Sequence, residues 1–174
     1  GGRSAIPATT AELTELAAAG GQLGIKTENL LEFTEAMSQL GTATNLRGEE
    51  GAQTLAKYMN IMGIDQSNVR NLGSAIVDLG NNYATTEADI ASMALRLGRT
   101  SAIVGISAQD TLAYATALSS LGIEAEAGGS AVSRTWTKLQ NAASQGGESL
   151  EAFASISGMT AEEAEGVIIE NFLN

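Results

Sequence analysis

The sequence contains no cysteine and no histidine among its 174 residues. Without cysteine there is no disulfide, no thiolate nucleophile and no cysteine-ligated zinc or iron–sulfur site. Without histidine the commonest general base is missing, which excludes Ser-His-Asp and Cys-His catalytic constellations and most transition-metal sites. An oxygen-only Ca²⁺ or Mg²⁺ site stays open in principle, but no D-x-D-x-D-G loop is present to form one. We therefore expect neither a cofactor nor a metal.

Basic residues are also scarce. Nine Lys and Arg stand against twenty Asp and Glu, which gives a net charge of −11. The basic residues are spread along the chain from Arg3 to Lys138 without a cluster, so a nucleic acid or an anionic membrane is not expected as a partner. The longest uncharged run near the middle covers residues 111–123, which is shorter than the ~18 apolar residues that a membrane span needs.

Aromatic residues make up only 4% of a chain that is 44% hydrophobic, and alanine supplies much of the remainder. Such a core depends on close approach of backbones rather than on large side chains. The single proline, Pro7, precedes the first predicted helix. We interpret residues 1–6 as an added or flexible N-terminus and residues 7–174 as one module excised from a longer chain.

Three windows of the sequence align without gaps, at residues 24–41, 63–80 and 105–122. A period of about forty residues is typical of repeated helical hairpins. Inside each window large apolar residues are spaced three or four positions apart, as a helix face requires. Five positions are identical in all three windows: Gly24/Gly63/Gly105, Ile25/Ile64/Ile106, Ala36/Ala75/Ala117, Leu40/Leu79/Leu121 and Gly41/Gly80/Gly122.

Each window begins with Gly-Ile and ends with Leu-Gly, and glycine in the left-handed region commonly closes a helix. Asp65 and Ser107 follow the window-starting Gly-Ile and are predicted N-caps, whereas Thr27 is the predicted cap in the first window. The predicted helix-closing glycines are Gly24, Gly41, Gly63, Gly80, Gly105 and Gly122.

Further helices are predicted around the windows, because apolar stripes of helical spacing cover residues 52–62, 90–104 and 132–143. Residues 9–23 form a first helix that opens with a Thr9-x-x-Glu12 capping box, and Thr160 opens a last one. A shorter helix is expected around residues 148–156. The predicted fold is all-α, with about eight short helices in tandem α-hairpin repeats. They pack as a compact bundle, which we favour, or as a short solenoid.

Adjacent acidic residues are the main candidates for chemistry. A carboxylate pair can hydrolyse a glycosidic bond, but acidic residues are also favoured in the first turn of a helix. Both pairs fall at predicted helix starts, so the structural interpretation is favoured. These acids are Glu49 with Glu50, and Glu162 with Glu163 and the nearby Glu165. Glycine pairs at residues 20–21, 128–129 and 146–147 lack the strand, helix and lysine of a phosphate-binding loop.

Other side chains leave two interpretations open. Arg96 and Arg99 form either an anion site or, more commonly for such residues, ion pairs with nearby acids. Met59 and Met62 share one predicted stripe, and Trp136 lies in another. These three residues belong to the core or face a partner.

Four segments of the chain carry a resemblance to a known family. They are residues 7–46 (PATTAELTELAAAGGQLGIKTENLLEFTEAMSQLGTATNL), 58–82 (YMNIMGIDQSNVRNLGSAIVDLGNN), 86–139 (TEADIASMALRLGRTSAIVGISAQDTLAYATALSSLGIEAEAGGSAVSRTWTKL) and 157–172 (SGMTAEEAEGVIIENF). In composition and order they resemble the core region of tail tape measure proteins from long-tailed bacterial viruses and prophages. Arg47-Gly48 departs from that pattern, where the family tends to have a Ser or Thr cap.

The resemblance implies a structural virion component that sets tail length while tube subunits polymerise around it. It implies tail tube and tail assembly chaperone proteins as partners, with possible self-association. It also implies location in the tube lumen, in the host cytoplasm during assembly, and departure ahead of the DNA during infection. No catalytic residue of the family maps onto this chain. Because glycines interrupt the helices, we expect a compact docking module rather than the length-setting rod. The alternatives are a non-viral α-hairpin adaptor and a tail-associated cell-wall hydrolase.

Overall fold

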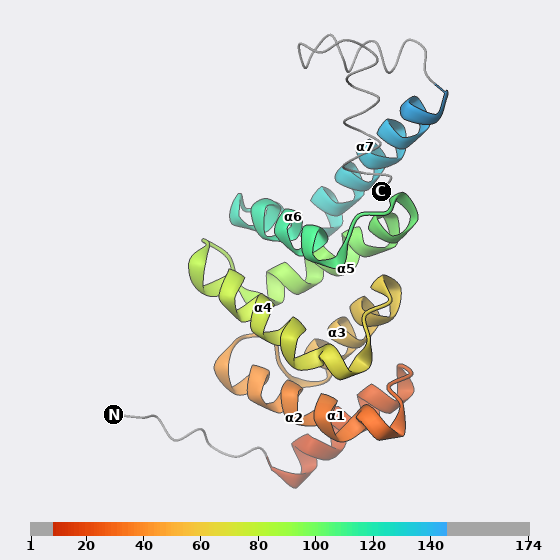
Figure 1. Ribbon diagram of the computed structural model, residues 1–174. Helices are drawn as coiled ribbons and strands as arrows, with labels where there is room; N and C mark the ends of the chain where they lie inside the picture. The colour runs from red at the N-terminus through yellow and green to blue at the C-terminus, as the bar shows by residue number, and fades with distance from the viewer. Residues whose placement is uncertain (1–8, 146–174) are drawn as a thin grey trace.

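A computed structural model describes residues 9–145, and all regular structure in that range is helical (Figure 1). This confirms the predicted all-α class. The helices predicted at residues 148–156 and from Thr160 lie outside the described residues. The elements are α1 (Thr10–Gln22), α2 (Thr27–Ala43), α3 (Gly48–Met62), the 3₁₀ turn η1 (Gln66–Asn68), α4 (Val69–Asn82), α5 (Glu87–Val104), α6 (Ala108–Ser120) and α7 (Ala125–Gln145).

The helices stack in two layers along the long direction of the molecule (Figure 1). The odd-numbered helices α1, α3, α5 and α7 pack one on the next and form the tighter layer. The even-numbered helices α2, α4 and α6 follow one another more loosely in the second layer. Each helix therefore contacts mainly its neighbours in the stack, which is the arrangement of a short solenoid, one of the two that the repeat predicted.

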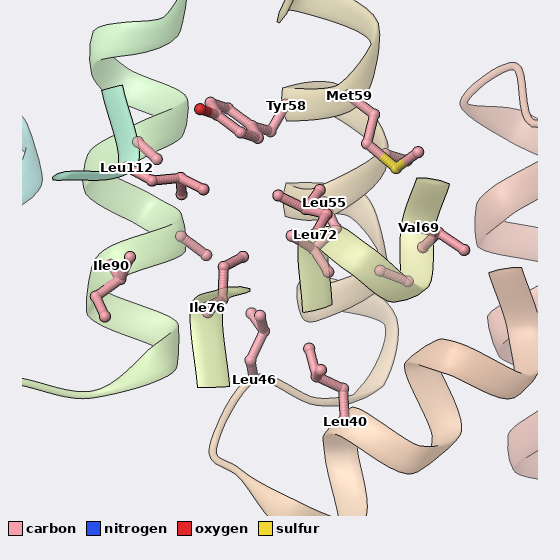
Figure 2. Packing of buried hydrophobic residues seen from close by; sticks show 14 of the residues in the cluster. Leu40, Leu46, Leu55, Tyr58, Met59, Val69, Leu72, Ile76, Ile90 and Leu112 are labelled. Carbon is pink, nitrogen blue, oxygen red and sulfur yellow. The ribbon is translucent and has the colours of Figure 1, made fainter. Parts of the chain in front are cut away.

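One continuous core runs between the two layers, and Figure 2 shows its central part. Leu55 of α3 lies beside Leu72 of α4, with Ile76 nearby, whereas Tyr58 of α3 points toward Leu112 of α6 (Figure 2). All five are at most 6% exposed. Burying one large apolar side chain contributes about 1.5–3 kcal/mol, so this core stabilises the stack of otherwise marginal short helices.

Glycines with a positive φ lie just after the ends of four helices. Gly63 and Gly105 are the C-cap residues of α3 and α5, with φ of 65° and 84°. Gly24 and Gly122 follow α1 and α6 with φ of 89° and 76°. A side chain disfavours this backbone region by roughly 1–2 kcal/mol, so glycine is the residue that permits these turns. Gly48, with φ of 66° at the start of α3, was not among the predicted glycines.

The prediction that a glycine closes the helix is wrong at two positions. Gly41 and Gly80 lie inside α2 and α4, which continue for two more residues, and neither has a positive φ. They are instead sites of close packing. A Cβ at Gly41 would come within 3.0 Å of Arg47 Cβ, and one at Gly80 within 2.6 Å of Glu87 Cδ. The small residue makes room for the chain as it enters the next helix.

The helix starts follow the predicted capping chemistry in two cases. Thr9 and Glu12 form the capping box of α1, and Ser107 accepts a hydrogen bond from the Asp110 backbone N–H at the start of α6. Asp65 caps the 3₁₀ turn η1 instead of α4. Hydrogen bonds from the Ser67 hydroxyl and backbone N–H lower the pKa of Asp65 below its ordinary range.

The predicted Thr27 cap is wrong, because Thr27 is already the first residue of α2 and the N-cap position belongs to Lys26. A distant side chain binds there instead. Gln66 Oε1 accepts from the Lys26 backbone N–H at 2.9 Å, and Gln66 Nε2 donates to the Gly24 carbonyl at 2.9 Å. This glutamine therefore joins η1 to the turn between α1 and α2.

Within residues 9–145, none of the helices combines the length and the hydrophobicity that crossing a bilayer requires.

Candidate functional site

An open groove with an apolar floor lies between α2 and α4. It encloses about 520 Å³. Its floor is built from small and aliphatic side chains because these helices of the looser layer do not meet along their whole length. A Cβ at Gly73 would come within 3.0 Å of Leu40 Cδ1. The absence of a side chain at Gly73 therefore leaves space in the groove above Leu40. The apolar lining residues are Ala36, Met37, Leu40, Ala43, Leu55, Val69, Gly73 and Val77.

Polar side chains form the rim of this α2–α4 groove. Arg70 of α4 reaches across to α2, with its Nε 3.3 Å from Glu32 and its Nη2 3.1 Å from Glu35. Its Nη1 also donates to Gln39 at 3.0 Å. Since these partners are substantially exposed, the ion pairs contribute modestly to stability. They link the two walls of the groove.

A second groove lies between α3, α5 and the start of α7, and it has basic walls. Lys57 of α3 lines it together with Arg96 and Arg99 of α5. Arg96 and Arg99 were singled out from the sequence but Lys57 was not, because it is far from them along the chain and only the stacking of α3 on α5 brings the three together. The remaining lining includes Ile61, Leu95 and Glu126.

Arg96 forms no ion pair among residues 9–145, contrary to the interpretation favoured from the sequence, and contacts α7 instead. Its Nη2 donates to the Ser130 hydroxyl at 2.7 Å. A side chain at Gly129 would collide with its aliphatic stem. The neighbouring Gly128 is equally crowded by Ile123 and Met93. This glycine pair therefore serves close helix packing.

The remaining predicted site residues occupy separate places. Met59 is buried in the core at 1% exposure, and Met62 is partly buried against it. Trp136 of α7 is 5% exposed and packs edge-on against Tyr114 of α6, with ring centroids 5.2 Å apart. All three therefore have packing roles within the stack.

The acidic pair Glu49 and Glu50 lies exposed in the first turn of α3, where Glu49 accepts from Gln53 at 3.1 Å. Nothing in residues 9–145 groups three potential metal-ligating acids together. Glu162, Glu163 and Glu165 lie outside the described residues. The candidate functional sites are therefore the two grooves.

A stack of helical hairpins with open grooves between successive helices defines an α-solenoid, a class that commonly binds other polypeptides along its surface. The chain belongs to the phage-related minor tail protein family, whose model matches residues 2–171. A "probable tape measure protein" of Halomonas phage phiHAP-1 is 25% identical over 123 residues, which is 66% of this chain. The matched region spans 14% of that relative's length. No solved structure gives a significant match. The resemblance to tape measure proteins is thereby confirmed, and the chain is a structural component of a phage tail.

Proposed function

We propose that this chain is a non-enzymatic docking module of a tape measure protein, acting in tail length determination, tail assembly and DNA ejection. The single observation that carries the proposal is the apolar α2–α4 groove, in a chain of the minor tail protein family. A groove with an aliphatic floor and a polar rim matches the way amphipathic helices dock into proteins. The expected occupants are helices of tail tube subunits or of tail assembly chaperones. The expected location is the tube lumen in the virion and the host cytoplasm during assembly.

The stacked architecture supports the docking role over that of the rod. A continuous helix of this chain would be ~260 Å long at about 1.5 Å per residue. The described helices instead turn back at every connection and bury one another's apolar faces (Figure 1). We therefore propose that residues 7–174 form one folded module and that the length-setting part lies elsewhere in the parent protein. Small-angle scattering should give a maximum dimension far below that of the continuous helix.

The docking role can be tested with a charge placed in the groove. Ala43 lines the groove but is exposed, so Ala43→Glu adds a carboxylate without disturbing the core. Ala113→Glu on the exposed face of α6 is the matched control. Binding to the purified tube subunit and the purified tail assembly chaperone of the same phage is measured by surface plasmon resonance.

A buried unpaired charge is costly, so the Ala43→Glu variant should bind at least one of these proteins about tenfold more weakly. The control should bind as the unmodified chain does. If neither protein binds, or if both variants bind equally well, the α2–α4 groove is not the docking surface.

A further inference from the structure

The basic groove between α3, α5 and α7 is unusual for a chain with a net charge of −11. Three of the nine basic side chains in the whole sequence line this one recess of about 510 Å³. They are those of Lys57, Arg96 and Arg99. All three residues are exposed. Like charges gathered in a recess repel one another, so the arrangement favours a negatively charged occupant.

These cations have no carboxylate ion-pair partner among the described residues, whereas Arg70 on the opposite layer binds two. Glu126 lines the same recess without forming an ion pair with any of them. Arg96 is also held in place, because Ser130 accepts its hydrogen bond and its stem packs over Gly129. A fixed guanidinium is pre-organised to bind a carboxylate with little loss of side-chain entropy.

Apolar side chains separate the cations along the recess. Ile61 of α3, Leu95 of α5 and Ala125 of α7 line the same walls. A partner that satisfies both kinds of contact needs carboxylates beside an aliphatic stripe, which is the surface of an acidic amphipathic helix. A nucleic acid fits less well, since it has no aliphatic stripe and the remainder of the chain would repel it.

We infer that the basic groove is a second docking surface and that it binds an acidic amphipathic helix of a partner protein. This inference rests on charge complementarity and stands independently of the role proposed for the α2–α4 groove. It also commits to a direction of charge: the partner helix supplies the carboxylates and this chain the cations.

The test uses the whole chain and a fluorescein-labelled helical peptide of about 18 residues, in which a leucine stripe is flanked by glutamates. A second peptide keeps the leucines and replaces every glutamate by glutamine. Fluorescence anisotropy at low ionic strength gives the dissociation constants. The protein variants are Lys57→Gln/Arg99→Gln and, as a matched control outside the groove, Lys26→Gln, which removes an exposed lysine.

The glutamate peptide should bind more tightly than the glutamine peptide, and salt should weaken its binding. The double variant should bind the glutamate peptide roughly tenfold more weakly, given typical energies of exposed charge pairs. Lys26→Gln should change the binding less than about twofold, because its charge lies outside the recess. Circular dichroism verifies that each variant keeps its helices.

Three results would overturn the inference. The first is equal affinity for the two peptides, and the second is unchanged affinity of the double variant. The third is tighter, groove-dependent binding of duplex DNA, which would make the surface a nucleic-acid site. The outcome of the α2–α4 groove test does not affect these results, because Ala43 lines that groove and not the basic one.

Discussion

The phenolic hydroxyl of Tyr58 in α3 donates a hydrogen bond to the backbone carbonyl of Ala108 in α6, at 2.8 Å. The two residues lie fifty positions apart in the sequence. Tyr58 is only 1% exposed and belongs to the core shown in Figure 2. The bond ties the first turn of α6 to the tighter layer of odd-numbered helices.

Removing this hydroxyl should destabilise the stack. Tyr58→Phe keeps the buried ring and loses the bond, which should lower the free energy of unfolding by about 1 kcal/mol. Urea unfolding followed by circular dichroism measures the change. Tyr83→Phe is the control, because Tyr83 is 58% exposed, and it should leave stability within about 0.5 kcal/mol of the unmodified chain.

Tyr58 also predicts how stability depends on alkaline pH. Burial raises the pKa of Tyr58 well above its ordinary value of 10.0. The unfolded chain therefore releases this proton at a lower pH than the folded chain does. The contribution of the protonated Tyr58 hydroxyl to the free energy of unfolding is therefore complete below about pH 10 and is lost as the pH rises above that value. Between about pH 9 and pH 11, stability should fall more steeply in the unmodified chain than in Tyr58→Phe. Equal slopes would contradict this assignment.

The left-handed glycines make a prediction with an internal control. Gly63 and Gly21 both have no atom within 4 Å of the place where a Cβ would lie, so they differ in backbone conformation and not in space. Gly63→Ala should destabilise the chain by roughly 1–2 kcal/mol because of its φ of 65°. Gly21→Ala, inside α1, should be neutral or stabilising by up to about 1 kcal/mol. Thermal unfolding of both variants decides the point, and a shift of the same sign in both would refute it.

Gln66 should prove more important than its partial exposure suggests. Besides its bonds at Lys26 and Gly24, its Oε1 accepts from Asn29 Nδ2 at 3.2 Å. Gln66→Ala should cost about 1 kcal/mol and should speed amide hydrogen exchange at the start of α2. Gln53→Ala removes a bond to a single exposed carboxylate and is the control. Unchanged exchange at the start of α2 in the Gln66 variant would show that this bridge does not stabilise the turn.

Two leucines in helices test the position of the core. Leu97 of α5 is fully buried, whereas Leu31 of α2 is 72% exposed. Leu97→Ala should cost about 2–5 kcal/mol, because α5 packs against α3, α6 and α7 and a cavity would remain. Leu31→Ala should change stability by no more than about 0.5 kcal/mol. Denaturant unfolding of the two variants gives the difference, and similar losses would place the core elsewhere.

Local chemistry explains where prediction from sequence succeeded. The spacing of Leu30, Phe33, Met37 and Leu40 predicted a helix, and these residues lie in α2 with Phe33, Met37 and Leu40 buried. Ser107 was predictable as a cap because its partner, the Asp110 N–H, lies three residues away. Gly41 and Gly80 were assigned wrongly, because a Leu-Gly pair looks the same whether the glycine closes a helix or makes room for a neighbouring chain.

The sequence by itself determined that this protein is helical, repetitive and poor in reactive side chains, because helix periodicity and composition act over a few residues. Only the tertiary structure decided the bridge from Gln66 to Gly24, the α2–α4 groove and the meeting of Lys57 with Arg96 and Arg99. Each of these depends on residues about thirty to forty positions apart, one repeat along the chain. Their distance in space is set by how one hairpin packs on the next, and no local pattern encodes that contact.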